Sequence, residues 1–192
     1  NFDSCLAVPI DYISPILPLK KVFGLAIGYG INRVTYPISM VSTGYGTADF
    51  NPGVGTANLT SAGDADVFIL KLDAAGNFVF AKQVGTDLAD AVGRIALDVS
   101  GNILLVGSLQ GTGDFDPGAG TTTFISAGNY DGFILKLNTS GNLVWVKQIG
   151  GANADLIYDL SQDNEGNIYT TGQFNSTVDF DPGAGTAPLT SN

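Results

Sequence analysis

The chain has 192 residues, 26 of them glycine, and charged residues make up only 14% of the total, a composition typical of a β protein with many turns. Eighteen acidic against eight basic residues give a formal net charge of −10, and this field repels nucleic-acid phosphates and anionic lipid. One cysteine and no histidine exclude an intrachain disulfide, histidine-dependent catalysis and metal sites with histidine ligands.

Residues 1–41 are expected to form an irregular lead-in. Four prolines interrupt the segment, at positions 9, 15, 18 and 37, and proline breaks regular helices and strands. A short apolar run after two lysines resembles a secretory leader but lacks a clear cleavage site. The sequence contains no run of about 20 apolar residues, so no membrane-spanning helix is predicted. The segment does not match the repeat that follows, because of a frame error in the source sequence or because it is a divergent edge element.

An acidic loop that contains proline occurs three times after this lead-in. It reads DFNPGVGT from Asp49 and DFDPGAGT from Asp114 and from Asp179, so successive copies lie 65 residues apart. This fixed period also relates the segments between the loops and indicates a tandem-repeat architecture. The sequence divides into the tail of a first repeat at 42–65, a second repeat at 66–130 and a truncated third repeat at 131–192.

Two hairpins are predicted in each 65-residue unit. The phrase Asp/Asn-x-x-Gly-Asn begins at Asp73 and Asp98, and again at Asn138 and Asp163, between apolar runs. An acidic or amide residue followed three places later by glycine is typical of a hairpin turn, because glycine takes positive φ readily. Each unit therefore contains four strands.

Both faces of the first hairpin in each unit are predicted to be apolar, one bulky and one slim. If Asp73 pairs with Asn77, the bulky face carries Phe68, Leu70, Leu72, Phe78 and Phe80, and the slim face Val67, Ile69, Val79 and Ala81. The next unit has Phe133, Leu135, Leu137, Leu143 and Trp145 against Ile134, Val144 and Val146. Such a sheet must be covered on both sides, and stacking bulky on slim faces does so. Four-stranded sheets stacked around an axis are the blades of a β-propeller.

The motifs also resemble a known family. The segments DVFILKLDAAGNFVFAKQVG and DGFILKLNTSGNLVWVKQIG, with the acidic loops, are similar to the seven-bladed β-propeller repeats (SBBP type) of large secreted bacterial proteins, over roughly residues 42–192. The resemblance implies a propeller fold in an extracellular or cell-surface setting and brings no defined catalytic activity. We therefore expect an all-β fold with about two complete four-stranded blades and partial ones, as a fragment of a larger propeller or part of an oligomeric ring.

The acidic loops are the candidate metal sites, and two interpretations are open. Alternating oxygen ligands with a glycine at the bend are typical of calcium loops, and the candidate ligands are Asp49, Asn51, Asp114, Asp116, Asp179 and Asp181. The match is partial, because the loops lack the further ligands of a full calcium loop. Alternatively, the aspartates bond to local backbone N–H groups in a tight turn that the phenylalanine anchors.

Other candidate residues have structural explanations. The carboxylates at positions 64, 66, 87 and 90 lie in predicted turns, where acidic residues usually cap or face solvent. The lysines at 71, 82, 136 and 147 recur at matching strand positions and are expected to cover apolar surface or to pair with loop acids. Trp145 aligns with Phe80, which favours a core residue over a sugar platform.

These observations predict a non-enzymatic extracellular scaffold or binding module, with calcium as its one candidate cofactor. Its partner would be a protein or a glycan, without nucleic-acid binding or membrane insertion. The blades would also contact the rest of a propeller or other copies of the chain. Two alternatives are a lectin-like oligomeric propeller and a propeller hydrolase or lyase with its active site outside this segment. The hydrolase would need two acids converging from different blades.

Overall fold

The computed structural model describes residues 26–27, 39–44 and 46–192. Every regular element in these ranges is a β-strand, so the expected all-β class is confirmed there. The strands are β1 (Ala26–Ile27), β2 (Ser39–Gly44), β3 (Thr47–Asp49), β4 (Asn58–Thr60), β5 (Asp66–Leu72), β6 (Phe78–Thr86), β7 (Ala91–Leu97), β8 (Ile103–Leu109), β9 (Thr112–Asp114), β10 (Thr123–Ile125), β11 (Asp131–Leu137), β12 (Leu143–Ile149), β13 (Leu156–Gln162), β14 (Ile168–Gln173), β15 (Thr177–Asp179) and β16 (Pro188–Thr190). In the same ranges, no helix is long and apolar enough to cross a membrane.

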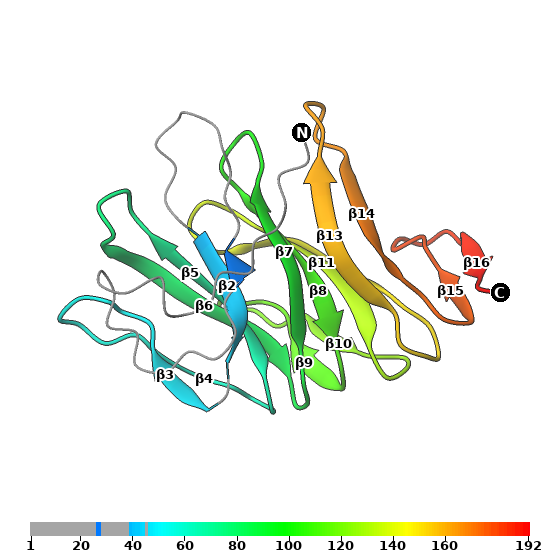
Figure 1. The fold of residues 1–192 in the computed structure, drawn as a ribbon, viewed down its shortest axis with the longest axis horizontal. Helices are drawn as coiled ribbons and strands as arrows, with labels where there is room; N and C mark the ends of the chain where they lie inside the picture. Colours follow the sequence, from blue (N-terminus) through cyan, green and yellow to red (C-terminus); the bar gives the residue numbers. More distant parts are fainter. Residues whose placement is uncertain (1–25, 28–38, 45) are drawn as a thin grey trace.

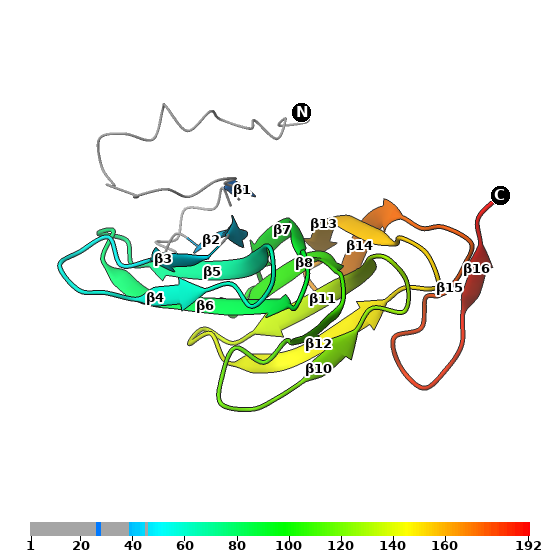
Figure 2. The same ribbon diagram turned by 90° about the horizontal axis from the view of Figure 1, so that it is seen from below.

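The long strands form three antiparallel sheets that lie side by side (Figure 1). The first has the order β1-β2-β5-β6-β9-β10, the second β12-β11-β8-β7, and the third contains β13 and β14. Figure 2 shows β5 and β6 stacked above β11 and β12. These sheets have the arrangement of β-propeller blades, as the sequence predicts.

The first and second sheets are built in the same register, offset by the sequence period. Ser39 of β2 pairs with Lys71 of β5, and Leu104 of β8 pairs with Lys136 of β11, so each partner is displaced by 65 residues. The repeat therefore extends back to Ser39, three residues before the expected boundary at 42. The rest of the expected lead-in, apart from β1, lies outside the described residues.

The four long strands of one sequence unit are divided between two sheets, which differs from the expected grouping. β5 and β6 belong to the first sheet, whereas β7 and β8 join β11 and β12 in the second. At the crossing, Ala65 and Ala89 form a parallel bridge, and the Asp90 N–H donates to the Ala65 carbonyl at 2.7 Å. β7 therefore begins next to the first sheet but does not pair as its edge strand, and it belongs to the second sheet. A repeat period measures the length of the unit but does not say where one sheet ends.

The predicted stacking of bulky on slim faces is confirmed between the first two sheets. One buried cluster contains Val67 and Ile69 from the first sheet and Phe133, Leu135 and Leu137 from the second. The opposite face of the second sheet packs against the third sheet, where Leu104 and Val106 meet Ile157 and Leu160. Each sheet thus buries apolar side chains on its neighbour.

Two aromatic residues lie on the face opposite to the predicted one. Leu72 pairs with Phe78 but Lys71 pairs with Phe80, so Val79 is an extra residue in a β-bulge. Because one extra residue reverses the faces that follow it, Phe80 packs in the cluster of the slim face. Ala81, the next residue along β6, packs instead with the bulky face.

The second unit repeats this bulge. The register shifts between Lys136 and Leu137, which places Val146 with the bulky face and Trp145 with the slim one. Trp145 is half-buried against the third sheet's cluster, so its interpretation as a core residue is confirmed and only its face differs from the prediction.

Candidate functional site: acidic loops and the outer seams

Each acidic loop is closed by an aspartate at the end of a short strand. The Oδ1 atom of Asp114 accepts the N–H groups of Asp116 at 2.9 Å and Thr122 at 2.8 Å. Asp49 and Asp179 accept the equivalent pairs, at 3.0 and 2.8 Å and at 3.0 and 2.7 Å. Local side-chain to backbone bonds of this kind define Asx turns.

The second polar residue of each loop makes one further turn. Asn51, Asp116 and Asp181 accept the N–H of the residue two places on, at 2.8, 2.8 and 2.7 Å. Backbone hydrogen bonds, the largest from Ala57 and Ala187, hold the pKa of Asp49 and Asp179 below the ordinary value. These bonds support the turn interpretation of the loops.

The six candidate calcium ligands are not brought together. The three loops follow β3, β9 and β15, which lie at separate places along the molecule (Figure 1). Among the residues that the structure describes, no group of three or more acidic or cysteine side chains could hold a metal ion. Calcium binding at these loops stays a prediction.

The phenylalanine of each loop is its hydrophobic anchor. Phe115 is fully buried and contacts Phe124 and Phe133, with ring centroids 5.6 and 5.0 Å apart. Phe50 contacts Phe68 at 4.5 Å in the same way. Phe180, the third copy, contacts Phe174 but keeps 36% of its surface exposed. The anchor predicted from the motif is therefore confirmed in the first two loops.

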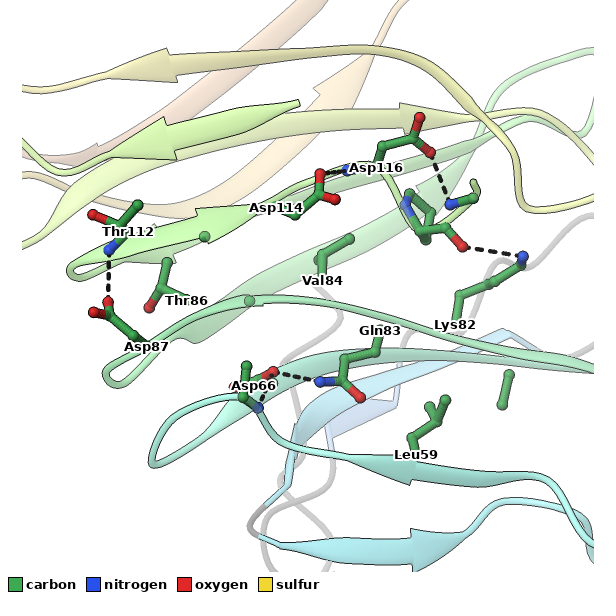
Figure 3. A pocket seen from close by; sticks show the side chains of 16 residues that line it. Leu59, Asp66, Lys82, Gln83, Val84, Thr86, Asp87, Thr112, Asp114 and Asp116 are labelled. Carbon is green, nitrogen blue, oxygen red and sulfur yellow. Dashed lines mark hydrogen bonds between the residues drawn. The ribbon is translucent and has the colours of Figure 1, made fainter. Parts of the chain in front are cut away.

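The loops belong to short two-stranded hairpins, and we call 47–60, 112–125 and 177–190 the seam hairpins. β9 follows β8 of the second sheet in the chain but pairs with β6 of the first, with Gly85 opposite Asp114 and Thr86 opposite Gly113. Lys82 of β6 donates to the Pro117 carbonyl of the acidic loop at 3.2 Å (Figure 3). The hairpin thus holds the outermost strand of the preceding sheet.

A glutamine ties each of the seam hairpins 47–60 and 112–125 to the sheet whose long strands follow it in the chain. Gln83 Nε2 donates to the Thr60 carbonyl at 2.7 Å and to buried Asp66 Oδ2 at 2.6 Å. Gln148 makes the same bonds to Ile125 and Asp131, at 2.7 and 2.6 Å. The sequence analysis missed this pair, although the recurring Lys-Gln dipeptide at 82–83 and 147–148 was a visible signal.

A groove of about 530 Å³ lies where β4, β6 and β9 meet, and Figure 3 shows its lining. Leu59 and Val84 contribute apolar surface, and Asp66, Asp114 and Asp116 contribute carboxylates. Each of these carboxylates already accepts a hydrogen bond from within the protein. The groove therefore has mixed polarity without a free reactive constellation.

Asp90 is a buried carboxylate at the crossing between sheets. Its Oδ2 accepts the Thr86 N–H at 2.7 Å, and both carboxylate oxygens lie 3.2 Å from the Thr86 hydroxyl. Burial, with a smaller contribution from the Asp66 charge, raises the pKa of Asp90 to about 7. Asp66 and Asp90 bond to local backbone as predicted for turn carboxylates, but both are buried rather than solvated.

Two of the four recurring lysines make the contacts that the sequence predicts, whereas Lys82 and Lys147 donate to proline carbonyls of the acidic loops. Lys136 pairs with Asp98 at 2.8 Å. Lys71 lies over the Phe80 ring and donates to the Thr139 carbonyl at 2.6 Å. They serve packing and turn contacts.

A row of four turns, each with the same closure, lies at the opposite ends of the long strands. The predicted Asp/Asn-x-x-Gly-Asn turns are confirmed, since the first residue accepts two backbone N–H groups in every copy. The glycines have φ between 77° and 92°, the left-handed region that glycine favours. The two middle residues differ between copies, and the first residue is asparagine at 138 and aspartate in the other three.

Comparison with known proteins agrees with this architecture. Residues 144–180 match the model of the β-propeller repeat family. The chain is 27% identical over 144 residues to an uncharacterized WD repeat-containing protein of Acanthamoeba polyphaga mimivirus, covering 70% of this chain and 10% of the relative. It is also 27% identical over 128 residues to the regulatory protein FlaEY of Caulobacter vibrioides, covering 64% of this chain and 13% of the relative. The chain thus spans about a tenth of the length of these curated relatives.

The fold and the match define a class. The chain is an array of β-propeller blades built from a 65-residue repeat, and residues 144–180 in the middle of its third repeat carry the recognised family pattern.

Proposed function

We propose that the chain is a non-enzymatic propeller scaffold that binds a partner protein through the tips of its loops. The observation that carries this proposal is the constant closure of the loops. Seven turns use the same side-chain to backbone bonds, three in the seam hairpins and four in the opposite row. Their conformations are set before any ligand arrives, and preorganisation lowers the entropic cost of binding.

The residues at the tips differ while the anchors stay constant. Val54 and Val99 are fully or largely exposed at two tips, where other copies carry alanine, threonine or asparagine. Binding residues are often found on loops that a rigid scaffold positions. Variable tips on fixed turns suit recognition of a surface better than catalysis, which needs groups unique to one blade.

The comparisons and the composition support the same role. One relative is named as a WD repeat-containing protein and another as a regulatory protein, and neither name denotes an enzyme. We further propose an extracellular or cell-surface location, supported by the net charge of −10 and by the resemblance to repeats of secreted proteins. Calcium binding stays one of the two interpretations of the acidic loops, and a rise in melting temperature with millimolar calcium would support it.

The test compares the native chain with a tip variant, Val54→Asp with Val99→Asp. Both are immobilised and probed with cell-surface protein extract and with a glycan array. We expect a protein that the native chain retains reproducibly and the tip variant loses, at an unchanged melting temperature. Equal retention by both proteins would contradict tip binding, and glycan binding alone would favour the lectin-like alternative.

A further inference from the structure

Two seam hairpins in the chain hold the outermost strand of a neighbouring blade by the same contacts. At the first seam, β9 pairs with the end of β6, and Lys82 donates to the Pro117 carbonyl. At the second, Val178 of β15 bridges Gly151, just beyond β12, and Lys147 donates to the Pro182 carbonyl at 3.4 Å. The strand that is held reads Lys-Gln-x-Gly at 82–85 and at 147–150.

The facing residues at the two seams compensate in size. Gly113 faces Thr86 at the first seam, and a Cβ at Gly113 would overlap the Gly85 carbonyl oxygen. At the second seam the large and small residues change places: Val178 stands where Gly113 does, and it faces Gly151, which stands where Thr86 does. One glycine is thus present in each facing pair, which shows that close approach of these two strands is a built feature of the seam.

The remaining seam hairpin, 47–60 with strands β3 and β4, contains the same motif residues. Asp49, Phe50 and Pro52 match Asp114, Phe115 and Pro117 at the 65-residue spacing. Its β4 side is fastened to the first sheet by the Gln83–Thr60 hydrogen bond. Its β3 side pairs with no strand among the described residues except β4.

The backbone of β3 presents an open edge on this free side. The Phe50 N–H donates to Ala57 and the Gly46 carbonyl accepts from Ser61, so these groups face β4. Because backbone groups alternate along a strand, those of Thr47 and Asp49 face outward. At the first seam the equivalent residue, Thr112, accepts the Asp87 N–H at 3.0 Å from the chain that follows β6.

We propose that the outer edge of β3 binds the outermost strand of another propeller blade, a strand that ends in Lys-Gln-x-Gly. The glycine of that strand lies opposite Asp49, and the next residue lies opposite Ala48. Its lysine donates to the Pro52 carbonyl. The interaction is β-strand addition to a preformed edge, and it goes beyond loop-tip binding because it uses backbone groups of the seam.

The experiment uses a fluorescent peptide with the sequence of residues 143–151, LVWVKQIGG, and the whole chain labelled with ¹⁵N. We expect saturable binding by anisotropy and amide shifts centred on Thr47 and Asp49. A peptide in which the lysine is replaced by glutamine should bind at least tenfold more weakly, and a scrambled peptide should not bind.

A matched pair of variants tests the edge itself. Thr47→Pro removes an outward N–H and should weaken binding at least tenfold, whereas Thr190→Pro alters β16, away from the proposed site, and should leave it unchanged. If Thr47→Pro does not fold, the amide shifts of the native chain decide alone. Absence of binding at millimolar peptide, shifts confined to the β14 edge, or self-association of the chain by pairing of one β3 edge with another β3 edge would each overturn the proposal.

Discussion

Arg94 and Asp159 occupy the same position in successive repeats, 65 residues apart, and their side chains form an ion pair with Nη1 and Oδ1 3.0 Å apart. The pair joins β7 of the second sheet to β13 of the third. One repeat position thus carries opposite charges in neighbouring blades, and the two side chains attract each other across the contact between β7 and β13.

Reversing one charge of this pair should weaken the contact between the second and third sheets. Both side chains are about half exposed, and exposed pairs contribute roughly 0.2–1 kcal/mol. We expect Arg94→Ala to lower the free energy of unfolding by less than about 1 kcal/mol, and Asp159→Arg to lower it further because it places like charges together. The double variant Arg94→Asp with Asp159→Arg should recover most of the loss. Equal stability of all variants in low-salt denaturation would show that the pair is not formed.

Truncating the buried anchor of the first seam should be far more damaging than truncating its counterpart. Phe115 has no exposed surface, and removal of a buried phenylalanine costs about 3–5 kcal/mol. Phe180→Ala is the matched control, because the same repeat position is 36% exposed there, and we expect a loss of less than about 2 kcal/mol. Chemical denaturation measures both, and equal losses would contradict the burial difference.

Stability should fall as the pH rises from about 4 to about 7 because of Asp90. Its folded pKa of about 7 lies above the ordinary aspartate value of 3.8, so the folded protein holds this proton more tightly than the unfolded chain. The stabilisation is complete below about pH 4 and is lost up to about pH 7, by at most about 1.4 kcal/mol for each pH unit.

Asp90→Asn removes this titration while keeping an oxygen that accepts the Thr86 N–H. We expect the variant's unfolding free energy to depend less on pH between 4 and 7 than that of the native chain measured in parallel. Identical curves for the two proteins would place the titration elsewhere.

Calcium should change the melting temperature little, because the loop carboxylates already accept backbone N–H groups. A site occupied at a hundred times its Kd would add about 2.7 kcal/mol, which corresponds to roughly 5–10 °C for a chain of this size. We expect a difference of less than about 1 °C between millimolar calcium and chelator. A rise of several degrees that disappears in Asp114→Asn would instead support the calcium interpretation.

Local chemistry made much of the fold predictable. The turns after Asp73 and Asp98 depend on an Asx residue and a glycine within five positions, so their sequence is sufficient to recognise them. The stacking of faces followed from the two-residue alternation of strands, for example Val67 and Ile69 against Phe68 and Leu70.

Features that depend on contacts between distant segments could not be predicted in this way. The bulge at Val79 leaves the composition of the strand unchanged, so the reversal of Phe80 and Ala81 had no signal within the strand. The crossing of β9 to β6 depends on pairing between Gly85 and Asp114, which the repeat period does not reveal. For the same reason the sequence indicated the individual acidic loops as candidate sites, and the contacts between seam hairpins and neighbouring strands were missed.

The seam hairpin 112–125 belongs structurally to two blades, because its strand β9 pairs with β6 of the first sheet. Hydrogen–deuterium exchange of the native chain and of Phe115→Ala tests it most directly, under conditions in which both are folded. We expect slow exchange at the end of β6 and in β9, and loss of protection in both segments together in Phe115→Ala, with β13 and β14 unchanged. Rapid exchange of residues 112–114 in the native chain, or loss of protection in β9 alone, would contradict it.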